Sequence, residues 1–245
     1  MSVSKSIIEK NVERIRADIV QACRKAGRHE QEISIIAVTK TVEIDAVAHA
    51  LELGIADLGE SRVQQLTERA AELEQLRASQ PSRFPHAPRW HMIGHLQRNK
   101  VKQVMDAASV IHSVDSLRLA EDISDRGVKD GRTTDIMLQV NCSQEPQKHG
   151  CAVGAAMHLA GMISTLKNIR LVGLMTMAQL SGDAQKSRPA FALLREMFEE
   201  LRHNGVGGAA FRHLSMGMSQ DYAVAVEEGA TMVRIGSAMF GEEGA

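Results

Sequence analysis

The amino-acid sequence predicts an α/β fold with one domain over residues 1–245, a (β/α)8 TIM barrel with an extra helix at its N-terminus. Short apolar runs alternate with helical patterns along the whole chain, which indicates parallel βαβ units. Eight such runs occur within 245 residues, and this number and length suit a closed barrel. An open doubly wound sheet is the alternative, but no GxGxxG motif follows the first apolar run.

The first half of the chain contains the extra helix and four of the eight strands. Apolar residues recur at helical spacing from residue 4 to residue 26, and Gly27 suits the end of that helix. The β-branched run 33–40 is typical of a strand buried on both faces of a parallel sheet. The expected strands are 33–40, 55–60, 90–94 and 110–114, and the expected helices are 46–53, 62–77, one from about 98 and one from 115.

The second half repeats the same alternation with four more strands. A polar loop at 143–150 follows the fifth strand, and the proline-containing loop at 78–89 is too short to separate two domains. The expected strands are 135–141, 170–177, 211–216 and 231–240, and the expected helices are 153–166, 187–203 and 219–228, with none resolved after the eighth strand.

Composition and charge exclude several classes of protein. A net charge of -1 provides no electrostatic attraction for nucleic acid or for an anionic membrane. The N-terminus lacks an apolar leader, and no run of 18 apolar residues occurs, so we expect no membrane segment. Cys23, Cys142 and Cys151 form no CxxC pair, which favours reduced thiols and a cytoplasmic location.

Lys40 is the first candidate functional residue. It ends the run 33–40, and strand alternation places it on the same face as Ile36 and Val38. One interpretation is a solvated lysine at a strand end. The other is a partly desolvated amine that forms a Schiff base with a carbonyl compound.

Small and polar residues follow the seventh and eighth strands, at the end of the barrel where ligands bind. Backbone N–H groups and hydroxyls in such turns suit a phosphate, although turn glycines and helix-capping serines produce the same pattern. The candidate phosphate-binding residues are Ser215, Gly217, Met218, Gly236 and Ser237.

Arg234 lies within the eighth strand, on the same face as Met232. Burial of an unpaired guanidinium is costly, so its partner must be an acid, for example Glu60, or a ligand atom. Three further positions at strand ends are weaker candidates for contacting a ligand: Ser61, His91 and Asn141. We expect no metal at His91 and His95, because four residues of strand span roughly 13 Å.

Six motifs together resemble the pyridoxal phosphate homeostasis proteins, and the resemblance extends from about residue 5 to residue 241. The motifs are Ala37-Val38-Thr39-Lys40, Gly59-Glu60-Ser61-Arg62-Val63-Gln64, Trp90-His91-Met92-Ile93-Gly94-His95-Leu96-Gln97-Arg98-Asn99-Lys100, Gly173-Leu174-Met175, Leu214-Ser215-Met216-Gly217-Met218-Ser219 and Met232-Val233-Arg234-Ile235-Gly236-Ser237. The resemblance implies a fold-type III barrel related to the N-terminal domain of bacterial alanine racemase.

The same resemblance implies that pyridoxal 5′-phosphate (PLP) is the cofactor and that Lys40 holds it as an internal aldimine. Arg234 would face the pyridine nitrogen, and Ser215, Gly236 and Ser237 would hold the phosphate. Many members of the family have Asn where Ser61 stands, so a contact from this position to the cofactor ring is not carried over.

These residues favour a protein that buffers and delivers PLP inside the cell over an enzyme. An arginine beside the pyridine nitrogen keeps it unprotonated and makes the ring a weak electron sink. Racemases of this fold also use a tyrosine from a second domain, and this chain has only Tyr222, at a helix start. The alternatives are a PLP-dependent racemase or decarboxylase, and a Schiff-base aldolase. We expect a monomer or weak dimer whose partners are PLP and apo-enzymes that need it.

Overall fold

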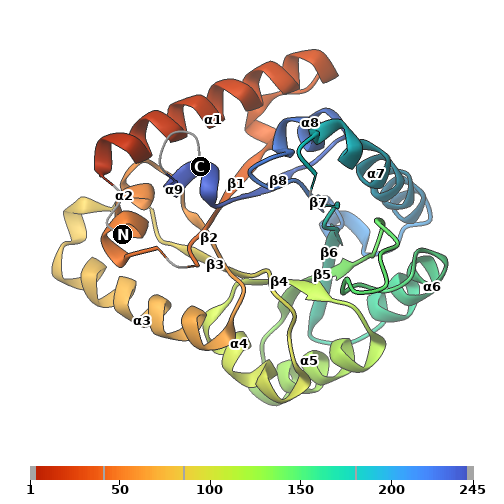
Figure 1. The fold of residues 1–245 in the computed structure, drawn as a ribbon. Coiled ribbons are helices and arrows are strands. Elements are labelled where there is room, and N and C mark those ends of the chain that lie inside the picture. The colour runs from red at the N-terminus through yellow and green to blue at the C-terminus, as the bar shows by residue number, and fades with distance from the viewer. Residues whose placement is uncertain (1–3, 41, 85, 180, 242–245) are drawn as a thin grey trace.

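The computed structural model describes residues 4–40, 42–84, 86–179 and 181–241. Its eight parallel strands close into a barrel in chain order, with β1 paired to both β2 and β8, and the helices form an outer ring (Figure 1). This arrangement confirms the predicted barrel. The strands are β1 (Ser34–Val38), β2 (Asp57–Glu60), β3 (Arg89–Met92), β4 (Val110–Val114), β5 (Thr134–Gln139), β6 (Ile169–Met175), β7 (His213–Ser215) and β8 (Met232–Ile235).

The helices follow the strands as expected from the apolar periodicity. The extra helix, α1, ends at Gly27, which has the left-handed backbone conformation (φ 65°) that favours glycine. Figure 1 shows α1 across the outside of the barrel, beside α8 and α9. The helices are α1 (Lys5–Ala26), α2 (Ile44–Glu52), α3 (Val63–Ser79), α4 (Val101–Ala107), α5 (Leu117–Asp130), α6 (Val153–Ser164), α7 (Arg188–His203), α8 (Tyr222–Glu227) and α9 (Ser237–Phe240).

Most strands end one or more residues before the predicted position, and the differences in the first and eighth strands affect the mouth of the barrel. The eighth strand stops at Ile235, and the short helix α9 begins at Ser237 instead of a continuing strand. The first strand stops at Val38, so that Thr39 is buried and Lys40 lies in an exposed turn. Of the two interpretations of Lys40, the structure agrees with a solvated side chain and not with a partly desolvated one, because the chain leaves the sheet before that residue.

The apolar core has two parts. One fills the space between the barrel and the helices, and the other fills the lumen with mostly aliphatic and methionine side chains. Cys23, Cys142 and Cys151 are buried and free, as expected for reduced thiols. None of the helices in the described part of the chain has the length and apolar character that a membrane span requires. The buried lumenal residues are Ile36, Met137, Val172, Met175 and Met232.

Gly173→Ala is expected to destabilise the barrel strongly. A Cβ atom at this position of β6 would lie 1.9 Å from the carbonyl oxygen of His213 on β7, so the paired strands must separate. Overpacking of this kind lowers the free energy of unfolding by about 3 kcal/mol or more. Urea denaturation measures the loss. Gly161→Ala in α6 is the control, because nothing lies within 4 Å of its added Cβ. Equal stability of the two variants would contradict the close approach of β6 and β7.

Candidate functional site

A chain of buried hydrogen bonds crosses the barrel lumen and begins at Arg234 on β8. The Arg234 guanidinium donates to Ser215 Oγ at 2.7 Å and to the carbonyl oxygen of Thr176 at 2.8 Å. Ser215 Oγ also lies 2.9 Å from Nδ1 of His112 on β4. Arginine only donates, so the Ser215 hydroxyl accepts from Arg234.

The chain continues from His112 towards the amino ends of β2 and β3. His112 Nε2 lies 2.9 Å from His91 Nδ1, and His91 Nε2 lies 2.9 Å from Asp57 Oδ1. An ionised carboxylate only accepts, so His91 donates its Nε2–H to Asp57. Arg89 closes the chain with two hydrogen bonds of 2.7 Å to the Asp57 carboxylate. We call these six residues the lumenal chain: Arg234, Ser215, His112, His91, Asp57 and Arg89.

Burial sets the charges along the lumenal chain. It lowers the pKa of Arg234 to about 10, so the guanidinium still carries its charge at neutral pH. Burial, together with electrostatic repulsion of a protonated ring by the neighbouring His91 and Arg234, holds the pKa of His112 well below its usual value. For Asp57 burial acts to raise the pKa, but hydrogen bonds from His91 and Arg89 outweigh it and lower the pKa. The charged Arg234 therefore stands at one end and the Asp57–Arg89 ion pair at the other, with a neutral His112 between them.

Glu60 is not the partner of Arg234. Its carboxylate accepts a hydrogen bond of 2.6 Å from Thr39 Oγ1 and pairs with Arg69 at 3.2 Å. Among the described residues, no carboxylate lies within ion-pair distance of the Arg234 guanidinium, whose acceptors are neutral oxygen atoms. The example of a structural ion pair with Glu60 is wrong, and a ligand atom remains as the other alternative.

The turn that carries Lys40 lies beside the β8–α9 turn. Ala37 of β1 pairs with Ile235 of β8, and a Cβ built on Gly236 would lie 3.4 Å from Val38 Cβ, in ordinary contact. Lys40 follows two residues after Val38 and is exposed at the carboxyl end of the barrel. A primary amine and a Gly-Ser turn therefore stand next to each other at the mouth.

The β7–α8 connection is tied to the same turn. Ser219 Oγ accepts hydrogen bonds from the backbone N–H groups of Gly236 (3.2 Å) and Ala238 (3.1 Å). Gly217 has a φ of +90°, and a side chain there would meet Ala225 Cβ at 2.5 Å. Met218 donates its backbone N–H to Asp221 Oδ1 at 2.7 Å. The two segments that the sequence assigned to phosphate binding are thus joined.

Known proteins are similar to this chain over the whole barrel. The family model described as "Alanine racemase, N-terminal domain" matches residues 11–244. A pyridoxal phosphate homeostasis protein of Aquifex aeolicus is 36% identical over 229 residues, which cover 94% of this chain and 95% of that protein. The chain belongs to the pyridoxal phosphate homeostasis protein family. The resemblance stated from the motifs is confirmed.

Two solved structures are similar over nearly the full length. An unknown protein from Bifidobacterium adolescentis has a TM-score of 0.90 and 35% identity, and the match covers 98% of each chain. PipY of Synechococcus elongatus, solved with PLP bound, has a TM-score of 0.80 and 30% identity, and the match covers 96% of this chain and all of PipY. The barrel of this family member is thus the one found in solved relatives.

The predicted site residues fall into two groups in this family member. Lys40, Gly217, Met218, Gly236 and Ser237 lie together at the mouth. By contrast, Ser215 and His91 are fully or almost fully buried in the lumenal chain, where their polar atoms already have partners.

Asn141 and Ser61 have local roles at the same end of the barrel. Asn141 donates to the carbonyl oxygen of Glu145 at 2.9 Å and accepts from Ser143, so its side chain holds the 143–150 loop. Ser61 follows β2, and its backbone N–H donates to Glu60 Oε2 at 3.2 Å. Contact of either residue with a cofactor stays a prediction.

The sequence analysis missed Asp57, Arg89 and His112, half of the lumenal chain. The sequence does contain one signal for His112, because it is a polar residue in the apolar strand Val110–Val114. Its partners come from β3 and β7, however, and no spacing along the chain relates these strands.

Proposed function

We propose that this chain binds PLP at the carboxyl end of the barrel, with Lys40 as the attachment point, and buffers and delivers the cofactor without robust catalysis. The observation that carries the proposal is the buried Arg234 guanidinium, which has neutral acceptors and lies on the strand next to that of Lys40. The names of its relatives and the PLP bound in PipY support the same function. The free buried cysteines support a cytoplasmic location.

The residues at the mouth fit the three chemical groups of PLP. Lys40 offers an accessible primary amine for the aldehyde. Gly217 and Gly236 have no side chain to keep a phosphate away from the backbone, and Ser237 would add a hydroxyl donor. Arg234 would donate to an unprotonated pyridine nitrogen. When bound, the cofactor supplies an aldehyde reactive towards amines and a ring that withdraws electrons.

The chain's own residues disfavour turnover. Arg234 keeps its charge at neutral pH, and a second positive charge on the adjacent pyridine nitrogen is disfavoured. The only tyrosine, Tyr222, lies on α8 and donates to Asp18 of α1 at 2.5 Å. Burial and the Asp18 carboxylate raise the pKa of Tyr222, so it is neither placed nor ionised to remove a proton at the mouth.

A test of delivery follows from the exposure of Lys40. We expect PLP-loaded protein to restore activity when it is mixed with an apo-enzyme that depends on PLP. Lys40 is exposed, so an incoming amine is able to reach it and displace it from the cofactor. In parallel, α-hydrogen exchange of alanine or serine in D₂O is expected to stay near the rate with free PLP. NMR follows the exchange. Unloaded protein is the control for the first measurement.

Two outcomes would overturn the proposal. Rapid, stereospecific exchange that depends on Lys40 would identify a racemase or decarboxylase. A protein without a visible absorbance band after incubation with PLP would instead favour a Schiff-base aldolase that uses the phosphate site for a sugar phosphate. The expected monomer or weak dimer stays a prediction, which sedimentation can measure.

A further inference from the structure

Two histidines and an aspartate gather on the rim of the barrel, on the side away from Lys40. His95 follows β3, Asp115 follows β4, and His149 lies in the loop between β5 and α6. In the closed strand order β4 and β5 lie opposite β8 and β1 (Figure 1). None of the three residues belongs to the lumenal chain, and the connections that follow β4 and β5 lie across the barrel from the Lys40 turn.

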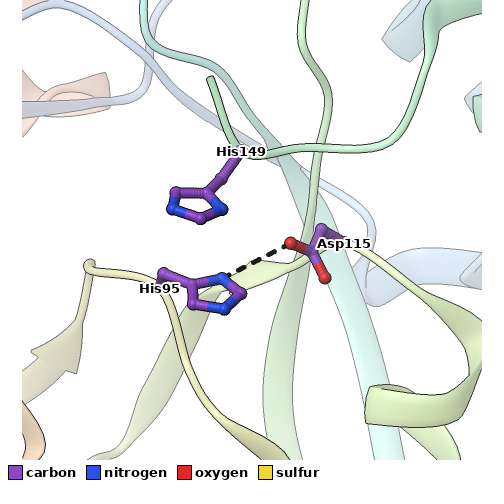
Figure 2. A group of neighbouring side chains, drawn as sticks. All are labelled: His95, Asp115 and His149. Carbon is purple, nitrogen blue, oxygen red and sulfur yellow. Dashed lines mark ion pairs between the residues drawn. The ribbon is translucent and has the colours of Figure 1, made fainter. Parts of the chain in front are cut away.

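The three side chains present their polar atoms to one another. The imidazole rings of His95 and His149 are stacked, with centroids 4.0 Å apart and planes 10° from parallel. Figure 2 shows that one nitrogen of each ring faces the Asp115 carboxylate. His95 Nδ1 lies 3.6 Å from Asp115 Oδ2, too far for a direct hydrogen bond. One possible ligand atom from each residue lies within 4.8 Å of the other two.

Close packing of the backbone holds two of these residues in place. His95 follows Gly94, where a Cβ atom would lie 2.1 Å from the carbonyl oxygen of Ser61, so β2 and β3 approach closely here. The carbonyl oxygen of His149 accepts from Gln139 Nε2 at 3.1 Å. The next residue, Gly150, has a φ of +121°, a backbone conformation that favours glycine. The histidine backbones are therefore fixed, while their exposed rings are able to turn.

Asp115 is positioned by the start of α5. It precedes Ser116, which caps this helix by accepting from the backbone N–H of Leu119 at 3.4 Å. The Asp115 side chain is 20% exposed and that of His95 is 41% exposed, so solvent reaches the space between them. The Asp115 carboxylate therefore lies beside the edges of the His95 and His149 rings (Figure 2).

We propose that His95, Asp115 and His149 form a binding site for a divalent first-row transition metal of the zinc class. Two imidazoles and one carboxylate are the donor set that such ions take, at about 2.0–2.2 Å, with water in the open position. Ligand atoms of a tetrahedral ion lie roughly 3.3 Å apart. Rotation of the exposed rings closes the remaining distance from 4.8 Å.

The proposal revises the expectation that the chain has no metal site. That expectation concerned His91 and His95, which do not share a ligand here, because His91 is buried in the lumenal chain. His95 instead meets two residues that are distant in sequence. The metal site includes neither Lys40 nor PLP, so a test of metal binding is independent of the proposed function.

Titration of chelator-treated protein with Zn²⁺ alone tests the proposal. We expect one ion per chain, and we expect His95→Gln, His149→Gln and Asp115→Asn each to weaken binding tenfold or more. Co²⁺ provides a second readout, because histidine and carboxylate ligation in a four-coordinate site produces strong visible bands. Zn²⁺ should also raise the thermal midpoint of the unsubstituted protein but not of the variants.

Two control variants make the test specific. His158→Gln removes an exposed histidine from α6 and should leave Zn²⁺ affinity unchanged. Lys40→Ala should also leave it unchanged, which separates the metal site from any binding of PLP. Wild-type affinity in the Asp115→Asn variant, or an equal loss in His158→Gln, would overturn the three-ligand site. Circular dichroism of each variant shows whether its fold is retained.

Discussion

Lys40→Ala is expected to abolish covalent attachment of PLP. Both the visible absorbance band of the loaded protein and the label trapped by borohydride reduction should disappear, because the proposed site attaches the cofactor through the Lys40 amine. Lys40 lies in an exposed turn, so the fold should survive, with a change in stability within about 0.5 kcal/mol. Peptide mapping of the reduced protein measures the labelled position.

Lys148→Ala is the matched control for this experiment. Lys148 Nζ donates to the carbonyl oxygen of Ala178 at 2.9 Å and pairs with Glu145, so its amine is held by the 143–150 loop. We expect full labelling of that variant. Label on Lys148 or Lys100 in the unsubstituted protein would show that Lys40 is not the attachment point.

Ser237→Asp is expected to lower the affinity for PLP by roughly a hundredfold or more, because it places a negative charge against the phosphate and removes a hydroxyl donor. Binding of unphosphorylated pyridoxal should change much less. An aspartate at the start of α9 is compatible with the helix, since acidic side chains are favourable there. Fluorescence titration with the two ligands gives both affinities.

Ser237→Ala separates the two causes of this loss. It removes the hydroxyl without adding charge, and we expect it to weaken PLP binding by roughly tenfold or less. Equal losses for PLP and pyridoxal in the aspartate variant would show that the β8–α9 turn does not hold the phosphate. Retained binding of PLP by the Lys40→Ala variant, without covalent attachment, would be consistent with an intact phosphate site.

The sequence by itself determined the barrel and the residues at its mouth. The alternation of apolar runs and helical patterns is a local property, because buried strands and amphipathic helices each require their own spacing of apolar side chains. Arg234 was recognised in the same way, as a charge inside an apolar strand. The motifs around Lys40 and Ser237 then identified the family, which the comparisons confirmed.

Only the tertiary structure decided how these residues are partnered. Ser215 is hydrogen-bonded to a histidine of β4, and Glu60 pairs with Arg69 instead of Arg234, because strand register and barrel closure select the contacts across the lumen. The exposure of Lys40 depends on where β1 leaves the sheet. His95, Asp115 and His149 meet because three successive connections end on one rim. Contacts between residues so distant in sequence are set by the packing of the whole barrel, and no local spacing of residues encodes them.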